Sequence, residues 1–344
     1  MFDPGPEAPG RELLGEPGNG PGTAGGAGAS HRHAPEEALR IGGARPPRIY
    51  IKRDDLLSLA LGGNKIRNLE FSLGAAIEGS ATDVITMGRA QSNHCRLTAA
   101  ACARAGLRAH LVMSGERPPV ARGNLLLSEL LGASVHFTGT DDRAVRELTA
   151  ARIAQDIVSR GDRPLVLPVG GSDARGAVGH VVAALEIARQ CDEIGEQPAA
   201  IVLATATGGT QAGLVAGLRK LDSGAAVHGF SVHRPAHEAT SDVRRLATDV
   251  AALIGAGRID ENAIFMDDSP LGAGYGVPSA AGQAAITLLA RTEGLAADPV
   301  YTGKALAGLL AMIHEGRFAE ASAVVFIHTG GTPALFADLP ATQA

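Results

Sequence analysis

The stretch from Ala200 to Leu221, AIVLATATGGTQAGLVAGLRKL, joins three local signals in one short segment. The apolar run Ala200 to Ala204 predicts a strand covered on both faces, and Gln211 to Leu221 has a helical pattern. The turn between them carries three threonines and two glycines. A strand, a glycine-rich turn and a helix N-terminus form a cup of backbone N–H groups that suits one phosphate monoester. The Lys of a Walker loop and the GxGxxG spacing of dinucleotide folds are both missing, so ATP and NAD are not favoured.

The same alternation of short apolar strands and helices continues on both sides of this stretch. Alternation of this kind is typical of crossover βα units and a parallel sheet, so we expect an α/β fold. The abundant glycine and the 3% aromatic content suit helices packed closely on sheets. The other expected strands are 48–52, 83–87, 108–113, 134–137, 165–169, 227–232 and 324–328, and the other expected helices include 66–76, 93–105, 123–131, 142–159, 177–191 and 279–293.

A chain of 344 residues is long enough for two domains. Residues 1–46 are rich in Gly, Pro, Ala and charged residues without a periodic apolar pattern, so we expect a disordered tail there.

The net charge of −5 and the scattered basic residues argue against a nucleic-acid partner. Three cysteines without metal-ligand spacing predict neither a metal site nor a disulfide. Since no apolar run is long enough for a bilayer and no leader pattern is visible, we expect no membrane contact and a cytoplasmic protein that acts on a small molecule.

Lys65 follows a double glycine, in the sequence Leu61-Gly62-Gly63-Asn64-Lys65. Apolar surroundings and the N-terminal dipole of the next helix would both lower the pKa of this lysine and free its amine for imine formation. An ordinary lysine in solvent at a helix start is the alternative.

A second block, Gln91-Ser92-Asn93-His94, follows the expected strand 83–87 and opens a helix. Ser92 and Asn93 are natural N-cap residues, so a purely structural role is available for them. His94 suits a general base, but a lone histidine in a first helical turn is more often packed or capping.

The C-terminal part contains Gly274-Tyr275-Gly276, then Asp298-Pro299-Val300-Tyr301-Thr302, then Phe326-Ile327-His328-Thr329-Gly330-Gly331. Tyr275 and Tyr301 are two of only three tyrosines, and both lie in glycine-flanked turns where the backbone can approach a ligand. Ordinary turn tyrosines are the alternative.

In this order the blocks resemble the pyridoxal-phosphate family of D-cysteine desulfhydrases and 1-aminocyclopropane-1-carboxylate deaminases, which have the tryptophan synthase β-like fold (fold type II). The resemblance runs from about Ile49 to Phe336 and includes Ile51-Lys52-Arg53-Asp54-Asp55 and Gly274-Tyr275-Gly276-Val277-Pro278. It implies a homodimer. It also implies a large cofactor domain, 47–65 plus 181–340, and a small inserted α/β domain, 66–180, with the site in the cleft between them.

The resemblance also assigns roles to individual residues. Lys65 matches the lysine that carries pyridoxal 5'-phosphate and would act as base, and Ser92, Tyr275 and Tyr301 match the other catalytic positions. The substrate, a small amino acid, would lie against Ser92, Asn93, His94 and the two tyrosines. Besides Lys65, the residues implied to hold the cofactor are Asn93, Ala206, Thr207, Gly208, Gly209, Thr210, Thr302 and Thr329.

The sequence departs from the family pattern in two ways, at one residue and in one segment. Thr302 stands where the deaminases have a glutamate that protonates the pyridine nitrogen, and a protonated ring withdraws electrons far better. Opening a cyclopropane needs that help more than expelling a β-substituent does. The chain also lacks the usual Thr-Pro-Leu segment before its first strand.

We therefore expect α,β-elimination from a small β-substituted amino acid. The best candidate is D-cysteine, which would give pyruvate, ammonia and hydrogen sulfide. The alternatives are a cyclopropane deaminase, an L-cysteate sulfo-lyase and a non-catalytic binding module of the same fold.

Overall fold

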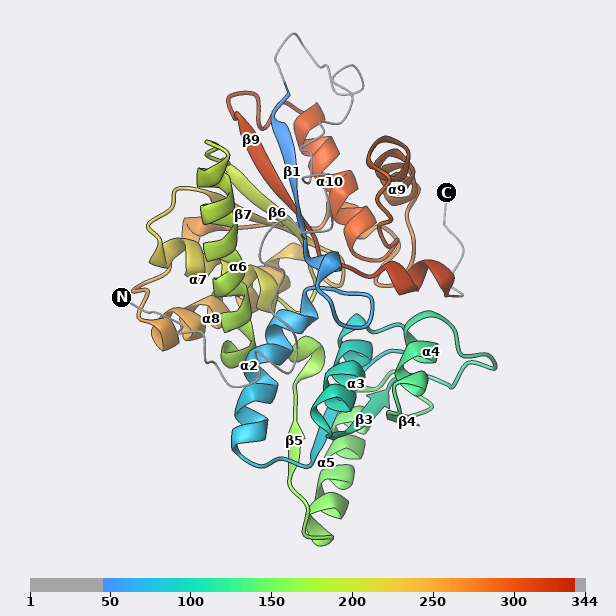
Figure 1. Cartoon of the computed structure of the whole chain (residues 1–344). Helices are drawn as coiled ribbons and strands as arrows, with labels where there is room; N and C mark the ends of the chain where they lie inside the picture. Colours follow the sequence, from blue (N-terminus) through green and yellow to red (C-terminus); the bar gives the residue numbers. More distant parts are fainter. Residues whose placement is uncertain (1–45, 338–344) are drawn as a thin grey trace, which may run out of the picture.

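The computed structural model describes residues 46–337, which form two lobes, each built around its own parallel sheet (Figure 1). Nearly all of the expected tail, 1–46, lies outside the described residues. Among the described residues, every strand pair of the two sheets is parallel, so the expected α/β class with parallel sheets is confirmed.

The larger sheet has five strands in the order β1-β9-β6-β7-β8. Its central strand, β6, pairs with β9 on one side and β7 on the other, and the edge strand β1 pairs with β9, so the N-terminal and C-terminal strands of the lobe lie side by side. The bounds are β1 Arg48–Arg53, β6 Ala200–Thr205, β7 Ala226–Ser231, β8 Ile264–Asp267 and β9 Ala323–His328.

Helices cover both faces of this sheet. Along β9, Val324 and Phe326 face a cluster with α9 and α10, whereas Val325 and Ile327 face a cluster with α6, α7 and α8. This period of two follows from the pleat of a strand. The bounds are α6 Ala174–Glu193, α7 Gly209–Lys220, α8 Ala236–Ile254, α9 Ala280–Glu293 and α10 Thr302–His314.

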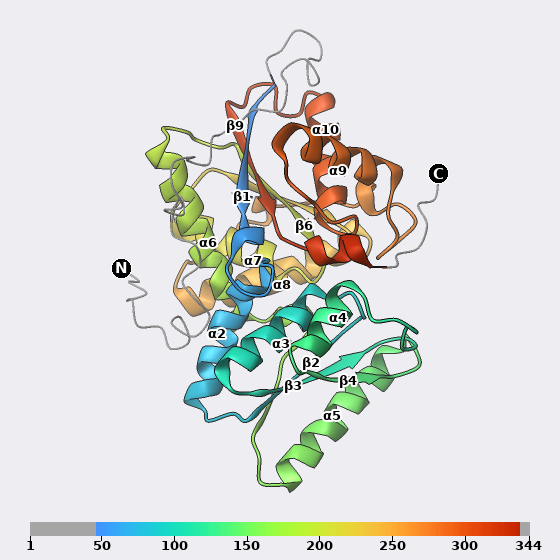
Figure 2. The ribbon, with the colours of Figure 1, turned by 45° about the vertical axis from the view of Figure 1, so that its right-hand side comes forward.

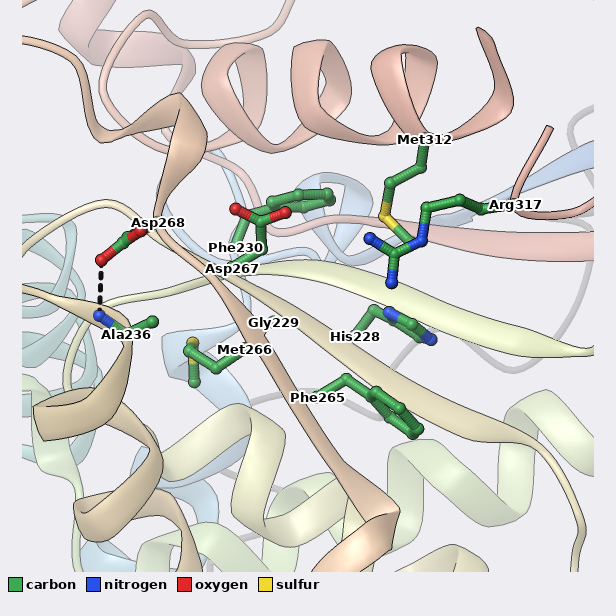
Figure 3. Close-up of a pocket in the computed structure, with 10 residues that line it drawn as sticks. All are labelled: His228, Gly229, Phe230, Ala236, Phe265, Met266, Asp267, Asp268, Met312 and Arg317. Carbon is green, nitrogen blue, oxygen red and sulfur yellow. Dashed lines mark hydrogen bonds between the residues drawn. The ribbon is translucent and has the colours of Figure 1, made fainter. Parts of the chain in front are cut away.

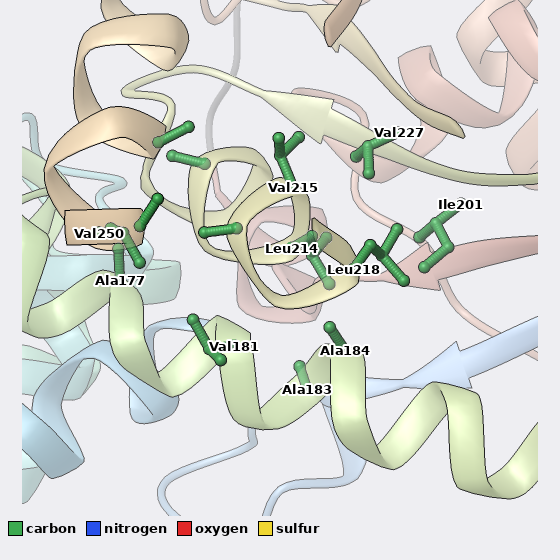
Figure 4. Close-up of a cluster of buried hydrophobic side chains, with 14 of the residues drawn as sticks. Ala177, Val181, Ala183, Ala184, Ile201, Leu214, Val215, Leu218, Val227 and Val250 are labelled. Carbon is green, nitrogen blue, oxygen red and sulfur yellow. The ribbon is translucent and has the colours of Figure 1, made fainter. Parts of the chain in front are cut away.

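Glycines let α7 lie directly on α6 (Figure 4). A Cβ on Gly213 would lie 2.2 Å from the Ala177 carbonyl oxygen, and one on Gly217 would lie 2.6 Å from the Cβ of Ala184. Because these glycines are four residues apart, they occupy the same face of α7. The high Gly and Ala content is thus used for close helix contacts.

The smaller sheet has the strand order β4-β3-β2-β5. Figure 2 shows β2, β3 and β4 in the lower lobe. The strands of this sheet all lie between residues 83 and 166, inside the segment 66–180 that the sequence predicts as an inserted domain; the exact boundary stays a prediction. One face packs with α2, α3 and α4, and the other with α5. The bounds are β2 Asp83–Gly88, β3 Arg108–Met113, β4 Ser134–Phe137, β5 Pro164–Val166, α2 Lys65–Glu78, α3 Asn93–Ala105, α4 Gly123–Leu130 and α5 Arg143–Ser159.

Two expected strands are shorter than predicted or displaced. The strand expected over 165–169 ends at Val166, because the chain turns at Gly170 and Gly171, both of which have positive φ. The strand expected over 227–232 runs one residue earlier, from Ala226 to Ser231.

Within residues 46–337 the three cysteines are buried and unpaired. The same part of the chain contains no helix long and apolar enough to cross a membrane and no cluster of three metal-binding side chains.

Candidate active site

The glycine-rich blocks meet where the two lobes join. The Asn64 backbone N–H donates to the Thr329 carbonyl oxygen (3.0 Å), and the Asn64 side-chain amide donates to Thr210 Oγ1 (2.9 Å). Gly330, with φ +94°, packs so closely that a Cβ there would lie 2.7 Å from the Cα of Gly63. Three turns that are far apart in sequence therefore surround the start of α2, which begins with Lys65.

Lys65 differs from the other lysines of the chain in its hydrogen bonds. The chain has four lysines. Lys52 donates to Glu186 and Gln190, Lys304 donates to the carbonyls of Leu271 and Gly274, and Lys220 donates to the carbonyl of Gly255. Among the described residues, the Lys65 amine alone of the four has no hydrogen-bond or ion-pair partner. It is the amine left free to react.

Burial lowers the pKa of Lys65 to about 8. The ammonium form loses hydration without gaining a carboxylate partner, so the neutral amine is favoured. A neutral amine is the form that attacks a carbonyl group.

We expect the attachment of pyridoxal phosphate to the cofactor-free protein to follow this pKa. Below pH 8 the reactive amine, and so the attachment rate, should rise about tenfold per pH unit, and above it the rate should level off. Stopped-flow absorbance measures this rate. A rate that kept rising to about pH 10, as for an ordinary lysine, would contradict the assignment.

The N-terminus of α7 presents the predicted phosphate cup. In the described structure the N–H groups of Gly209, Thr210 and Gln211 have no acceptor, as expected for a first helical turn. Gly208 has φ +87° and directs the chain into the helix. The hydroxyls of Thr207 and Ser172 lie 2.5 Å apart beside this turn. Unpaired donors at a positive helix end suit a phosphate.

Side chains at Gly208 and Gly209 should weaken cofactor binding, by contact with protein neighbours. A Cβ on Gly209 would lie 2.8 Å from Ser172 Oγ, and one on Gly208 would lie 3.0 Å from Val243 in a left-handed conformation. The turn would have to move, so we expect the double alanine variant to bind pyridoxal phosphate at least about tenfold more weakly in a titration. Gly224→Ala, which meets nothing within 4 Å, is the matched control. Equal affinities would mean that the turn holds no phosphate.

The N-terminus of α3 carries the second predicted block. Ser92 is the N-cap, and its Oγ accepts from the Cys95 N–H at 3.2 Å, so the capping role is confirmed. In the described structure the N–H groups of Asn93 and His94 have no acceptor. Asn93 Oδ1 accepts from Asn124 at 2.9 Å, which leaves the Asn93 amide N–H groups free for a ligand oxygen.

His94 is 2% exposed, and its Nε2 lies 3.0 Å from the Thr86 hydroxyl. Burial, and secondly the charge of Lys65, lower the pKa of His94 to about 3. The imidazole is therefore neutral at physiological pH.

Tyr275 and Tyr301 come together, with their hydroxyl oxygens 2.5 Å apart and their rings in an edge-to-face arrangement. Burial raises the pKa of both phenols, so both stay protonated at neutral pH. One hydroxyl proton lies between the two oxygens and the other remains available.

Thr302 is fully buried at the start of α10. Its hydroxyl donates to Asp298 Oδ1 (2.7 Å) and accepts from the Asp298 N–H (2.8 Å). Contact of Thr302 with the cofactor stays a prediction.

Thr329 is 7% exposed and its hydroxyl has no partner among the described residues. The Ala206 carbonyl accepts from Arg234 at 3.3 Å.

Sequence reasoning missed three residues that shape the site. They are Ser172 and His180, which touch the phosphate cup, and Asn124, which orients Asn93. Gly170-Gly171-Ser172 is a further double glycine ahead of a helix, which is the same signal that marked the other turns. Asn124 and His180 carry no such local signal.

Residues 34–330 match the family model of pyridoxal-phosphate dependent enzymes. The chain belongs to this family. It is 42% identical over 301 residues to D-cysteine desulfhydrase of Salmonella newport, covering 85% of this chain and 89% of that one. The fold is similar to an ACC deaminase homologue, with a TM-score of 0.79, 34% identity and 88% of each chain covered. A pyridoxal 5'-phosphate-dependent aspartate racemase, at 20% identity and a TM-score of 0.63 over 87% of this chain and 89% of that chain, shares the fold. The protein is thus an enzyme that uses pyridoxal phosphate.

The residues present fit this cofactor. The free amine of Lys65 would bond the cofactor aldehyde. The unpaired donors at the α7 N-terminus would hold its phosphate, and the free amide of Asn93 would hold its ring oxygen.

A separate cavity of about 190 Å³ lies at the edge of the larger sheet, between β7, β8 and α10 (Figure 3). None of its lining residues is a predicted site residue, and it is smaller than usual ligand pockets.

Proposed function

We propose that this enzyme eliminates the β-substituent of a small amino acid, with D-cysteine as its substrate and pyruvate, ammonia and hydrogen sulfide as products. Within the family, one observation favours elimination of a β-substituent over opening of a cyclopropane ring. The residue next to Tyr301 is the neutral Thr302, whose hydroxyl is bonded to Asp298 in place of an acid that could protonate a ring nitrogen. The 42% identity with a D-cysteine desulfhydrase supports the same substrate.

Bound pyridoxal phosphate supplies an electron sink for negative charge at the substrate α-carbon. Lys65 supplies the base. Its pKa of about 8 makes the free amine a good proton acceptor near neutral pH, and no neighbouring carboxylate holds the amine back.

The N-terminus of α3 is suited to the substrate carboxylate. The free N–H groups of Asn93 and His94 point out of a positive helix end. The Ser92 hydroxyl accepts from Cys95 and so keeps its own proton to donate to a carboxylate oxygen. These donors fix the amino acid by its charged group, whatever its β-substituent.

The tyrosine pair is suited to the departing group. Since one proton joins the two oxygens, the second is available to hydrogen-bond or protonate a thiolate that leaves the β-carbon. The raised pKa values keep both phenols protonated for this task.

A panel of amino acids tests the proposal on the purified holoenzyme. We expect D-cysteine to give pyruvate and sulfide faster than L-cysteine, L-cysteate, serine and 1-aminocyclopropane-1-carboxylate give product. Faster turnover of the cyclopropane substrate would overturn the argument from Thr302. Thr302→Glu is unsuitable as a gain-of-function test, because its carboxylate would be buried beside that of Asp298.

We also propose that the enzyme is a homodimer of the cytoplasm. The helices α4 and η6 (Thr332–Phe336) lie side by side (Figures 1 and 2). On them Leu126, Leu130 and Phe336 are 50%, 78% and 72% exposed, an apolar surface suited to a second copy. The three unpaired cysteines agree with a reducing compartment.

Charges on this surface should separate the subunits. We expect light scattering to give twice the chain mass of 35.0 kDa for the wild type and the single mass for Leu130→Asp with Phe336→Asp, because a charge buried without a partner is costly. Val158→Asp, at an exposed position on α5, is the control. A monomeric wild type would refute the dimer.

A further inference from the structure

A fully buried arginine without a carboxylate partner lies in α3, next to the candidate site. Arg96 is not exposed at all, and within residues 46–337 its hydrogen-bond acceptors are one amide oxygen and two backbone carbonyl oxygens. Burial lowers its pKa to about 10, so the guanidinium is still charged at neutral pH. Buried charges in proteins are normally paired, as Arg67 is with Asp54 and Glu186. The bare charge of Arg96 therefore calls for an explanation.

Two of the three bonds of Arg96 hold the turn that precedes Lys65. Its Nη1 and Nη2 atoms donate to two carbonyl oxygens of residues 60–63, the second at 2.9 Å. All four residues of this turn have positive φ, among them Ala60 (+42°) and Leu61 (+66°). Such backbone persists only where its surroundings hold it in place. Arg96 thus fixes the turn that delivers Lys65 to the start of α2.

The third bond of Arg96 begins a relay of side-chain amides toward the site. Arg96 Nε donates to Asn124 Oδ1 (2.7 Å), and Asn124 Nδ2 donates to Asn93 Oδ1 (2.9 Å). A guanidinium only donates, so the oxygen of Asn124 faces Arg96 and its NH2 group faces Asn93. The Gln91 carbonyl, which only accepts, lies 3.0 Å from the same NH2 group and requires the same orientation. The Asn93 NH2 group is the last donor of the relay.

The direction of these bonds gives the relay an electrostatic effect. Hydrogen bonds that point the same way along a chain polarise one another, and a charged donor at the start strengthens the next bond. Among the described residues no carboxylate forms an ion pair with Arg96, so its field is not cancelled there. The NH2 group of Asn93 is therefore a stronger donor to an anionic oxygen than an isolated amide would be.

We propose that Arg96 is a positioning residue that acts through Asn124, so that its buried charge orients and polarises the Asn93 amide toward the ring oxygen of pyridoxal phosphate. Its two other bonds hold the turn before Lys65, so one side chain sets the relative positions of the groups that would bind the ring oxygen and the aldehyde. The inference holds for any amino-acid substrate. It rests only on the contact of Asn93 with the cofactor.

The variant Asn124→Asp tests the relay in the holoenzyme. The new carboxylate has the shape of the amide and still accepts from Arg96, but it cancels the charge of Arg96 and cannot donate to Asn93. We expect pyridoxal phosphate to bind at least about tenfold more weakly in a titration. The pH midpoint of the visible absorbance of the bound cofactor should rise by about one unit or more, because a nearby positive charge that repels protons is lost.

Two further variants separate charge from general damage to the protein. Asn262→Asp adds the same charge at an exposed position of η4 (Glu261–Ala263) and should keep the wild-type affinity and midpoint. Arg96→Lys keeps a positive charge at the start of the relay, so it should shift the midpoint less than Asn124→Asp does. The titratable side chains at the starts of α2 and α3, Lys65, His94 and Cys95, are the same in every variant.

Nitrogen NMR of the wild-type chain with labelled asparagine needs no variant to fold. The side-chain NH2 protons of Asn124 should exchange slowly with water, with and without cofactor, because they are bonded and buried. The NH2 signal of Asn93 should shift when pyridoxal phosphate is added. Fast exchange at Asn124 would contradict the relay.

Asn93→Ala distinguishes the two ways in which the inference can fail. If this variant shifts the absorbance midpoint and Asn124→Asp leaves both affinity and midpoint unchanged, the relay from Arg96 is refuted. If neither variant has an effect, Asn93 does not bind the ring oxygen, and the placement of the cofactor is itself wrong.

Discussion

Replacing Lys65 by alanine is expected to abolish both the covalent attachment of pyridoxal phosphate and multiple turnover. Loss of a general base alone lowers rates by roughly 10²- to 10⁴-fold, and loss of the attachment point adds to this. The side-chain amines of the other three lysines already donate hydrogen bonds to carboxylate, amide or carbonyl oxygens, so they cannot replace Lys65. Visible absorbance of the bound cofactor and pyruvate release measure the two effects.

Lys220→Ala is the control for this variant. Lys220 lies at the end of α7 and donates to the Gly255 carbonyl, away from the cup. We expect it to keep wild-type absorbance and activity. An active Lys65→Ala enzyme with normal absorbance would show that the assignment of Lys65 is wrong.

Replacing Arg67 by leucine should cause a large loss of stability. Arg67 is 2% exposed and its guanidinium bonds both Asp54 (2.8 Å) and Glu186 (3.0 and 2.8 Å). Burial alone would raise the pKa of Glu186, but the hydrogen bonds and charge of Arg67 lower it. Without Arg67 two carboxylates stay buried, with only Lys52 close to Glu186.

We expect the free energy of unfolding of Arg67→Leu, measured in urea, to fall by about 3–5 kcal/mol. Arg143→Leu removes an exposed pair with Glu147 and should change it by about 0.5 kcal/mol at most. Similar losses in the two variants would mean that the buried cluster does not stabilise the start of α2.

The parallel α/β fold was predictable because apolar runs and helical periods are local signals. The β6 segment was found from five consecutive apolar or small residues ahead of a glycine turn. The four-residue strand β8 was not among the predicted strands, although the equally short β4 was. Helices α8 and α10 were not among the predicted elements either, although Thr302 and Tyr301 at the start of α10 were singled out as site residues.

Part of the site was equally predictable. Each glycine turn follows or precedes a regular element, and parallel strands bring their carboxyl ends to one edge, so separate blocks were expected to meet. The partners within the site were not predictable. The contact of Asn64 with Thr210 and the contact of Asn68 with His180 join residues more than 100 positions apart. The bond between Thr302 and Asp298 shows that a residue type at a motif position does not reveal where its hydroxyl is directed.

The central claim is that Lys65 carries the cofactor, and one measurement tests it directly. Borohydride reduction of the holoenzyme fixes pyridoxal phosphate to the lysine that holds it, and mass spectrometry of the digested chain then locates the modified residue. The account predicts a single modification on the peptide that contains Lys65. A modification on Lys52, Lys220 or Lys304 with Lys65 unmodified would contradict it.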